Sequence, residues 1–136
     1  MKPIKIVFDS NIYLAAIQKN SYARIQLQRS QPNGAYQLFI SPEILVEIRG
    51  KLETKFGYTT KESSDFLEMI MDYAKQVYPK RRLTNVLKDK DDHKILECAI
   101  EAGAALIITA DRGLLKLKEF EGIRIAHPSM LKYWFK

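Results

Sequence analysis

Two aspartates stand where apolar segments of the sequence end. Residues 4–8 (IKIVF) have the composition of a buried strand and are followed at once by Asp9. Residues 105–109 (ALIIT) form a second apolar segment, and Asp111 comes just after it. In open sheets of parallel strands, ligands bind outside the carboxyl ends of the strands. Both carboxylates are therefore expected at the same edge of a sheet, where they can take part in chemistry.

Two helices are expected to contribute further acids. The helix predicted from Asp92 has apolar residues three, four and seven positions later, which places Asp92 on the stripe that faces the core. Asp89 and Asp91 stay candidates beside it, although helical phase favours Asp92. In the helix predicted after residue 41, Glu47 flanks the apolar stripe, whereas Glu43 lies one turn earlier and further towards solvent.

Each acid also has an explanation that needs no chemistry. Asp9 and Asp111 can cap the helices that follow them, and Glu47 can be a solvated residue on a helix flank. A first-turn acid such as Asp92 stabilises the helix dipole, but this does not explain why it points inward. The functional interpretation depends on the convergence of all four acids at one edge of the sheet.

Clustered carboxylates favour a hard divalent cation. Like charges repel and raise one another's pKa unless a cation neutralises them. Without a compensating His or Cys, such a cluster suits Mg²⁺ or Mn²⁺ rather than zinc. His93 is expected to point away from the stripe and His127 lies near the C-terminus, so neither is an expected ligand. A divalent cation activates water and stabilises a leaving oxygen, which is the chemistry of phosphodiester hydrolysis.

The overall charge is compatible with a nucleic-acid substrate. The 136 residues carry a net charge of +6 with a pI of about 9.4, and they fit one domain spanning residues 1–136. A basic surface favours polyanions, although many basic proteins bind none. Five basic residues surround Asp92 in sequence and are candidates for holding a substrate backbone, while any one of them can be a solvated loop residue. They are Arg81, Arg82, Lys88, Lys90 and Lys94.

The sequence gives no sign of secretion or of a membrane. Cys98 is the single cysteine, so an internal disulfide is impossible and a reducing cytoplasm is the expected compartment. No apolar stretch approaches the roughly 20 residues of a membrane span, and the first apolar run leads directly into Asp9 rather than into a signal-peptide cleavage site.

Strand and helix patterns alternate along the chain. Ser41 with Pro42 opens one helix, Thr59 with Glu62 forms a capping box for another, and Gly103 stops a third. Alternation of this kind predicts a three-layer α/β/α fold with a mostly parallel sheet of about five strands. The expected strands are 4–8, 36–40, 105–109 and 123–126. The expected helices are 12–18, 21–30, one that begins at 42, 59–76, 92–102 and 129–135. A short helical turn is expected at 114–115 and a chain turn at 31–35.

Other α/β enzymes with an acid after the first strand fit less well. A haloacid-dehalogenase-like phosphatase needs a second aspartate two residues on, where this sequence has Asn11. A receiver domain needs an acidic pair after its first strand, and a Rossmann enzyme needs a glycine-rich first turn. The stretch FDSNIYLA contains neither.

The sequence resembles the PIN domain, the nuclease fold of VapC-type toxins. The resemblance runs nearly end to end, through FDSNIYL, SPEILVEIRGKL, DKDDHKILECAIEAGAALIITADRGLL and IRIAHPSMLKYW. It implies a ribonuclease that uses Mg²⁺ or Mn²⁺ and cuts single-stranded RNA. It further implies a possible homodimer and a small antitoxin partner.

The same resemblance assigns roles to individual residues. By motif, Asp9, Glu47, Asp92 and Asp111 are the metal-binding and catalytic acids, with Asp111 the most variable in the family. Ser10, Asn11 and Thr109 are polar neighbours that orient water or ligands. The alternative from a different class is a PIN-like RNA-binding or scaffold protein whose acids are structural and whose catalysis is weak.

Overall fold

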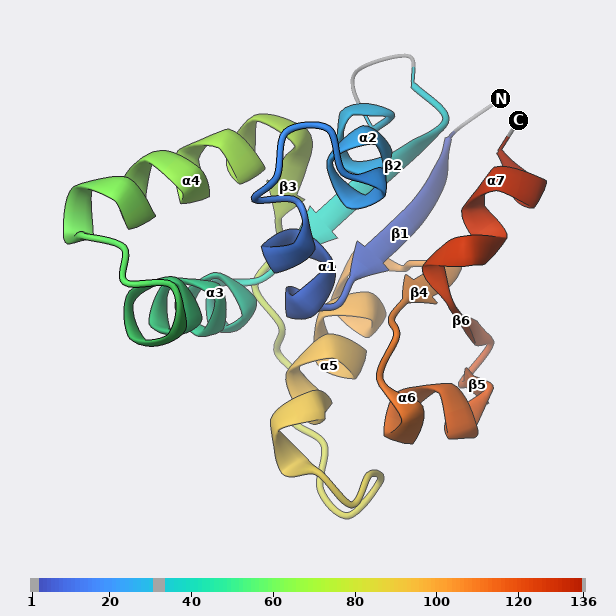
Figure 1. The fold of residues 1–136 in the computed structure, drawn as a ribbon. Helices are drawn as coiled ribbons and strands as arrows, with labels where there is room; N and C mark the ends of the chain where they lie inside the picture. The colour runs from blue at the N-terminus through green and yellow to red at the C-terminus, as the bar shows by residue number, and fades with distance from the viewer. Residues whose placement is uncertain (1–2, 31–33, 136) are drawn as a thin grey trace.

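The computed structural model describes residues 3–30 and 34–135, and its centre is a six-stranded sheet (Figure 1). The strands run in the order β3-β2-β1-β4-β6-β5, and all neighbours are parallel except the antiparallel pair β5 and β6. Their bounds are β1 (Ile4–Phe8), β2 (Tyr36–Ile40), β3 (Ala74–Gln76), β4 (Leu106–Ile108), β5 (Glu119–Phe120) and β6 (Ile123–Ala126).

Seven helices and two 3₁₀ turns connect the strands of the described residues. Several start at the side chains expected from sequence: the Ser41 hydroxyl accepts from the Ile44 N–H, and Thr59 forms its capping box with Glu62. The elements are α1 (Ser10–Ala15), α2 (Tyr22–Gln28), α3 (Pro42–Lys55), α4 (Thr60–Tyr73), η1 (Lys90–Asp92), α5 (His93–Ala102), α6 (Arg112–Leu117), η2 (Pro128–Met130) and α7 (Leu131–Trp134).

The strand order creates a topological switch point between β1 and β4. The chain moves from β1 outward to β2 and β3, then returns to the other side of β1 to form β4. Because parallel crossovers are right-handed, outward and returning connections cover opposite faces of the sheet, which gives the three-layer α/β/α arrangement. The crevice at the carboxyl ends of β1 and β4 is where such folds bind ligands. Asp9 follows β1 and Asp111 lies three residues after β4.

The core is built from the apolar strand residues that the sequence indicated. Ile6, Val7 and Phe8 of β1 are completely buried, as are Ile107 and Ile108 of β4. Helix α5 packs against β1, β2 and β4. Within the described residues, no helix combines the length and the apolar character that a membrane crossing requires.

Three sequence expectations differ from the structure. The helix expected to reach residue 76 ends at Tyr73, because residues 74–76 pair with β2 as strand β3, and this tertiary pairing overrides the local helical pattern. Strand β5 was not expected, since two residues carry too little pattern to be detected. The first helix starts at Ser10 rather than residue 12, because Asp9 caps it. Of the turn expected at 31–35, residues 31–33 lie outside the described residues.

Candidate metal centre

Asp9 is a buried acid held by three hydrogen bonds. Its side chain is 4% exposed. Oδ1 accepts from the Ser10 hydroxyl at 3.2 Å and from the Asn11 N–H at 3.4 Å, and Oδ2 accepts from the Thr109 hydroxyl at 2.7 Å. Asp9 therefore does cap α1, as the non-chemical explanation expects, and it is also tied to the end of β4. The carboxylate cannot turn without breaking these bonds.

Asp111 caps the next helix from the neighbouring strand end. Its Oδ2 accepts from the Leu114 N–H at 2.9 Å at the start of α6, and its own N–H donates to Thr109 Oγ1 at 3.0 Å. Thr109 is fully buried and so links Asp9 and Asp111 through one hydroxyl. The fold thus brings together the two strand-end acids that the sequence predicted to meet.

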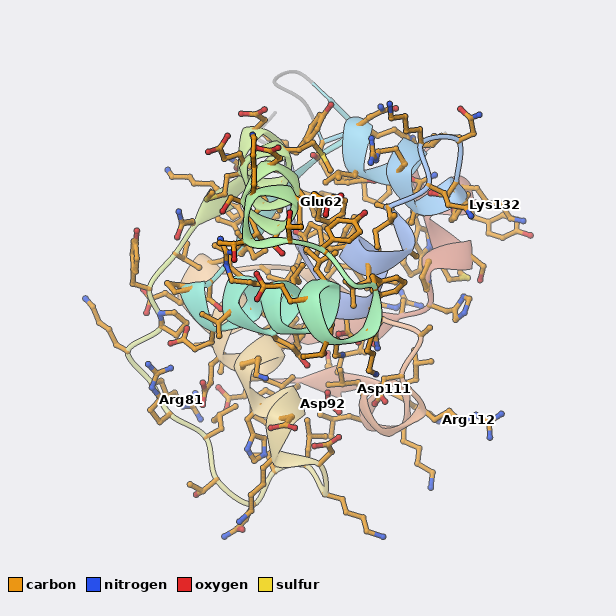
Figure 2. All side chains as sticks on the ribbon, turned by 60° about the vertical axis from the view of Figure 1, so that its left-hand side comes forward. Glu62, Arg81, Asp92, Asp111, Arg112 and Lys132 are labelled. Carbon is orange, nitrogen blue, oxygen red and sulfur yellow. The ribbon has the colours of Figure 1, made fainter. Side chains whose placement is uncertain are left out.

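Asp92 completes a crowded group of acids. It lies at the N-terminus of α5 but makes no capping hydrogen bond there, so a cap does not account for it. Burial raises the pKa of Asp92 to about 7, and the negative charges of Asp111, Asp89 and Asp9 add to this effect. A hydrogen bond with Asp111 also favours the protonated form. Figure 2 shows Asp92 and Asp111 close together below α3.

A groove of about 740 Å³ lies next to these acids. Asp89, Asp92 and Asp111 line it together with two lysines, Lys88 and Lys116. The floor is apolar and includes Val86, Leu87 and Leu117. An acidic centre flanked by lysines and apolar side chains is suited to a ligand that carries both phosphate and an apolar ring.

Glu47 is paired with two lysines. Its two carboxylate oxygens lie 3.4 Å from Lys51 Nζ and 3.5 Å from Lys94 Nζ. Lys51 also donates to Asn11 Oδ1 at 3.2 Å, which connects Glu47 to the start of α1, the helix that Asp9 caps. Glu43 instead pairs with Arg82 at 3.3 Å. Between these two candidates, Glu47 is the one linked, through Lys51, to the start of α1 next to Asp9.

The oxygen atoms of these acids are donors that suit a divalent cation, although the acids do not yet surround a single point. Asp9, Asp92 and Asp111 offer hard oxygen donors, and their mutual repulsion is the electrostatic strain that a cation relieves. Within residues 3–30 and 34–135, no three His, Cys, Asp or Glu side chains already stand in metal-binding geometry.

Two of the arginines expected near the substrate have carboxylate partners elsewhere. Arg81 pairs with Glu121 through two contacts of 2.6 Å, and neither Arg81 nor Arg82 lines the groove that holds Asp92. Figure 2 shows Arg81 well separated from Asp92. Arg82 bridges Glu43 and the buried Glu97 at 3.3 and 3.1 Å. Lys88 lines the groove and Lys94 contacts Glu47.

His93 has a structural contact. Its side chain is buried and its Nε2 accepts the Leu87 N–H at 3.1 Å. It is one of three α5 side chains, spaced one turn apart, that accept N–H groups from the connection preceding the helix. The other pairs are Glu97 with Leu83 at 2.8 Å and Glu101 with Lys80 at 3.1 Å. These three hydrogen bonds hold the connection before α5, which also carries Lys88 and Asp89, against the helix.

Comparison with known proteins identifies the family. Residues 5–113 match the PIN domain family. The chain belongs to the PIN-domain family. No functionally curated protein matched the sequence.

Solved structures share the fold. VapBC2 from Rickettsia felis, bound to a DNA fragment from its promoter, superposes with a TM-score of 0.66 at 16% identity over 91% of this chain and 98% of that one. PAE2754 from Pyrobaculum aerophilum superposes with a TM-score of 0.57 at 17% identity over 97% of this chain and 89% of that one. At this level of identity the likeness concerns the fold of the PIN domain.

Sequence reasoning missed three residues around the acids of this PIN domain. Lys51 and Lys116 contact or line the site, and the only signal for Lys51 is its position four residues after Glu47. Gly113 leaves room for Asp111, since a Cβ at this position would lie 3.1 Å from Asp111 Oδ2. A glycine two residues after an aspartate is too common a pattern to indicate this.

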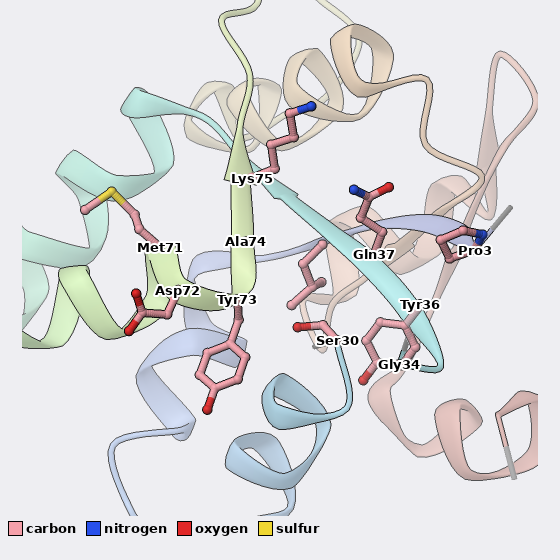
Figure 3. A pocket seen from close by; sticks show the side chains of 11 residues that line it. Pro3, Ser30, Gly34, Tyr36, Gln37, Met71, Asp72, Tyr73, Ala74 and Lys75 are labelled. Carbon is pink, nitrogen blue, oxygen red and sulfur yellow. The ribbon is translucent and has the colours of Figure 1, made fainter. Parts of the chain in front are cut away.

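A second hollow of about 510 Å³ lies beside strands β2 and β3 (Figure 3). Tyr36, Tyr73 and Lys75 line it, and its one acid is Asp72. None of the four acids predicted for the PIN-domain site lies there.

Proposed function

We propose that this PIN domain is a metal-dependent endoribonuclease that hydrolyses phosphodiester bonds in single-stranded RNA. The observation that carries the proposal is the convergence of Asp9, Asp92 and Asp111 at the switch point of the sheet, where Thr109 joins Asp9 to Asp111 and neighbouring acids raise the pKa of Asp92. Acids held close together against their repulsion are typical of functional sites. PIN domains are generally nucleases, which agrees with this interpretation.

In the proposed enzyme, Asp9, Asp92 and Asp111, with Glu47 beside them, hold Mg²⁺ or Mn²⁺. The ion supplies an acidified water and stabilises charge on the scissile phosphate. The hydrogen bonds from Ser10, Asn11 and Thr109 fix the orientation of Asp9, so that its oxygens are aimed before substrate arrives. Lys94 and Lys51 hold Glu47, and Lys88 and Lys116 supply positive charge for RNA phosphates. Contacts of Arg81 and Arg82 with RNA remain a prediction.

The proposed biological setting is a toxin–antitoxin pair. The fold likeness to VapBC2 from Rickettsia felis supports a small antitoxin protein as the partner. A homodimer and a cytoplasmic location belong to the same proposal, and the buried, free thiol of Cys98 is compatible with a reducing compartment.

The test is cleavage of labelled single-stranded and hairpin RNAs with Mn²⁺, Mg²⁺ or EDTA. Wild type is compared with Asp9→Asn and Asp92→Asn, each checked for folding by circular dichroism. We expect metal-dependent cleavage that both folded variants lose. Equal cleavage by all three proteins would identify a contaminating ribonuclease and contradict the proposal.

One observation favours the alternative of a catalytically weak RNA-binding or scaffold protein. Asp9 and Asp111 both cap helices, and Glu47 has two lysine partners, so three of the four acids have structural contacts already. In that case Asp9→Asn would lower stability, and RNA would bind equally well with Mg²⁺ or EDTA and stay intact.

A further inference from the structure

A second groove, separate from the one that Asp92 lines, includes Asn11 of the helix that Asp9 caps. It has a volume of about 620 Å³ and lies between α1 and the C-terminal end of α3. Leu14, Ile17 and Phe56 form its apolar part. Asn11, Lys51 and Lys55 are at its rim, so the groove begins two residues from Asp9.

Phe56 is an exposed aromatic side chain on a fixed backbone. The residue is 51% exposed although the ring is large and apolar. The N–H groups of Phe56 and Tyr58 both donate to the Leu52 carbonyl, at 3.2 and 3.0 Å. Gly57 between them has a φ of +68°, a conformation that favours glycine. The backbone at the end of α3 is therefore fixed, and the Phe56 ring that it carries is exposed as a stacking platform requires.

The charge of the groove is positive. Its lining includes two lysines and no acid, and because Lys51 is paired with Glu47, the uncompensated charge is that of Lys55. Lys51 reaches back to Asn11 and Glu47, while Lys55 is exposed and makes no ion pair or side-chain hydrogen bond within the described residues. An aromatic face flanked by lysines is the combination that binds single-stranded nucleic acid, because bases stack on the ring and phosphates meet the ammonium groups.

We propose that this groove binds one nucleotide of single-stranded RNA next to the scissile phosphate, with its base on Phe56 and its phosphate at Lys55. The inference rests on the proposed nuclease function and specifies how its substrate lies. In this arrangement the RNA strand runs from the acids into the groove with Phe56. Positive charge and continuity with Asp9 favour RNA over a peptide as the occupant.

The test measures binding of fluorescein-labelled oligouridylate by anisotropy, in Mg²⁺ and in an Asp9→Asn background that prevents cleavage. An abasic oligomer of the same length keeps the phosphates and removes the bases. We expect Phe56→Ala to weaken oligouridylate binding by about 5- to 150-fold, the effect of losing one stacked base. Abasic binding should not change, and Phe56→Trp should restore affinity for oligouridylate.

The contact of Lys55 with RNA phosphate is tested by the salt dependence of binding. Lys55→Ala should reduce the slope of log affinity against log salt concentration by about 0.7, the value for one phosphate contact on a single strand. Lys132→Ala is the charge-matched control on α7, which Figure 2 shows far from α3, and it should leave the slope unchanged. Tyr78→Ala removes another exposed aromatic ring, 66% exposed and outside the groove, and should not affect affinity.

The outcomes separate this inference from the function on which it rests. RNA cleavage by the wild type together with unchanged binding by Phe56→Ala and Lys55→Ala would overturn the inference and leave the nuclease intact. Binding that depends on Phe56 and Lys55, with no cleavage by the wild type, would support the groove and contradict the nuclease.

Discussion

The Thr109 hydroxyl donates a 2.7 Å hydrogen bond to Asp9 and accepts one of 3.0 Å from the Asp111 N–H. One buried side chain thereby joins the ends of β1 and β4 at the switch point of the sheet. The relative position of two proposed metal-binding acids depends on this hydroxyl, although Thr109 itself need not touch RNA.

Replacing Thr109 tests this link. Thr109→Val keeps the shape and removes the hydroxyl, which leaves the Asp111 N–H without its acceptor and Asp9 without one donor. We expect a loss of about 1–3 kcal/mol in the free energy of unfolding and a fall in RNA cleavage. Thr109→Ser keeps the hydroxyl and should retain most of the stability and most of the cleavage activity. Urea denaturation and cleavage rates check this, and equal behaviour of the two variants would contradict it.

The metal-free protein should lose stability as pH rises towards neutrality. In the folded state the pKa of Asp92 is about 7, whereas an unfolded aspartate titrates near 4. Between these values the folded state binds the proton more tightly, so the free energy of unfolding falls as pH rises and levels off above the folded pKa. The side chain is partly exposed, so solvent screening limits the size of the effect.

Asp92→Asn should flatten this pH dependence. Urea denaturation in EDTA at pH 5.5 and pH 8 compares the variant with the wild type, so that titrations of groups that do not interact with Asp92 cancel in the comparison. We expect the variant to be more stable than the wild type at pH 8 and the difference to shrink at pH 5.5. A variant that is less stable at pH 8 would show that Asp92 serves the fold.

Two helical glycines provide a matched pair. Alanine at Gly50 of α3 meets nothing within 4 Å, so Gly50→Ala should stabilise the protein by about 0.5–1 kcal/mol through helix propensity. At Gly113 the new Cβ would lie 3.1 Å from Asp111 Oδ2 and displace that carboxylate. Gly113→Ala should therefore gain less stability and lose cleavage activity. Cleavage by both variants at the wild-type rate would show that the position of Asp111 is unimportant.

Most of the fold could be predicted from sequence because its signals are local. The apolar runs of β1 and β2, the Ser41 cap and the capping box of Thr59 each specify an element from a few neighbouring residues. Strand β3 could not be predicted, since Ala74, Lys75 and Gln76 have no strand pattern and are extended because they pair with β2. Such pairing is a property of the tertiary structure.

The acids of the site were predictable for a different reason. Asp9 and Asp111 follow strands, and the parallel topology brings strand ends to one edge. The partners of the charged side chains were not predictable. Lys51 reaches Asn11, Lys94 reaches Glu47, and Arg82 reaches Glu43 and Glu97, across contacts between separate elements that no local pattern encodes.

The most direct test of the central claim is Mn²⁺ binding by isothermal titration calorimetry, with no RNA present. Wild type is compared with Asp92→Asn, and with Asp72→Asn as the control acid beside β3. The account predicts that wild type and Asp72→Asn bind Mn²⁺ alike and that Asp92→Asn binds it much more weakly. Equal binding by wild type and Asp92→Asn, or none by the wild type, would contradict a metal centre at the carboxyl ends of β1 and β4.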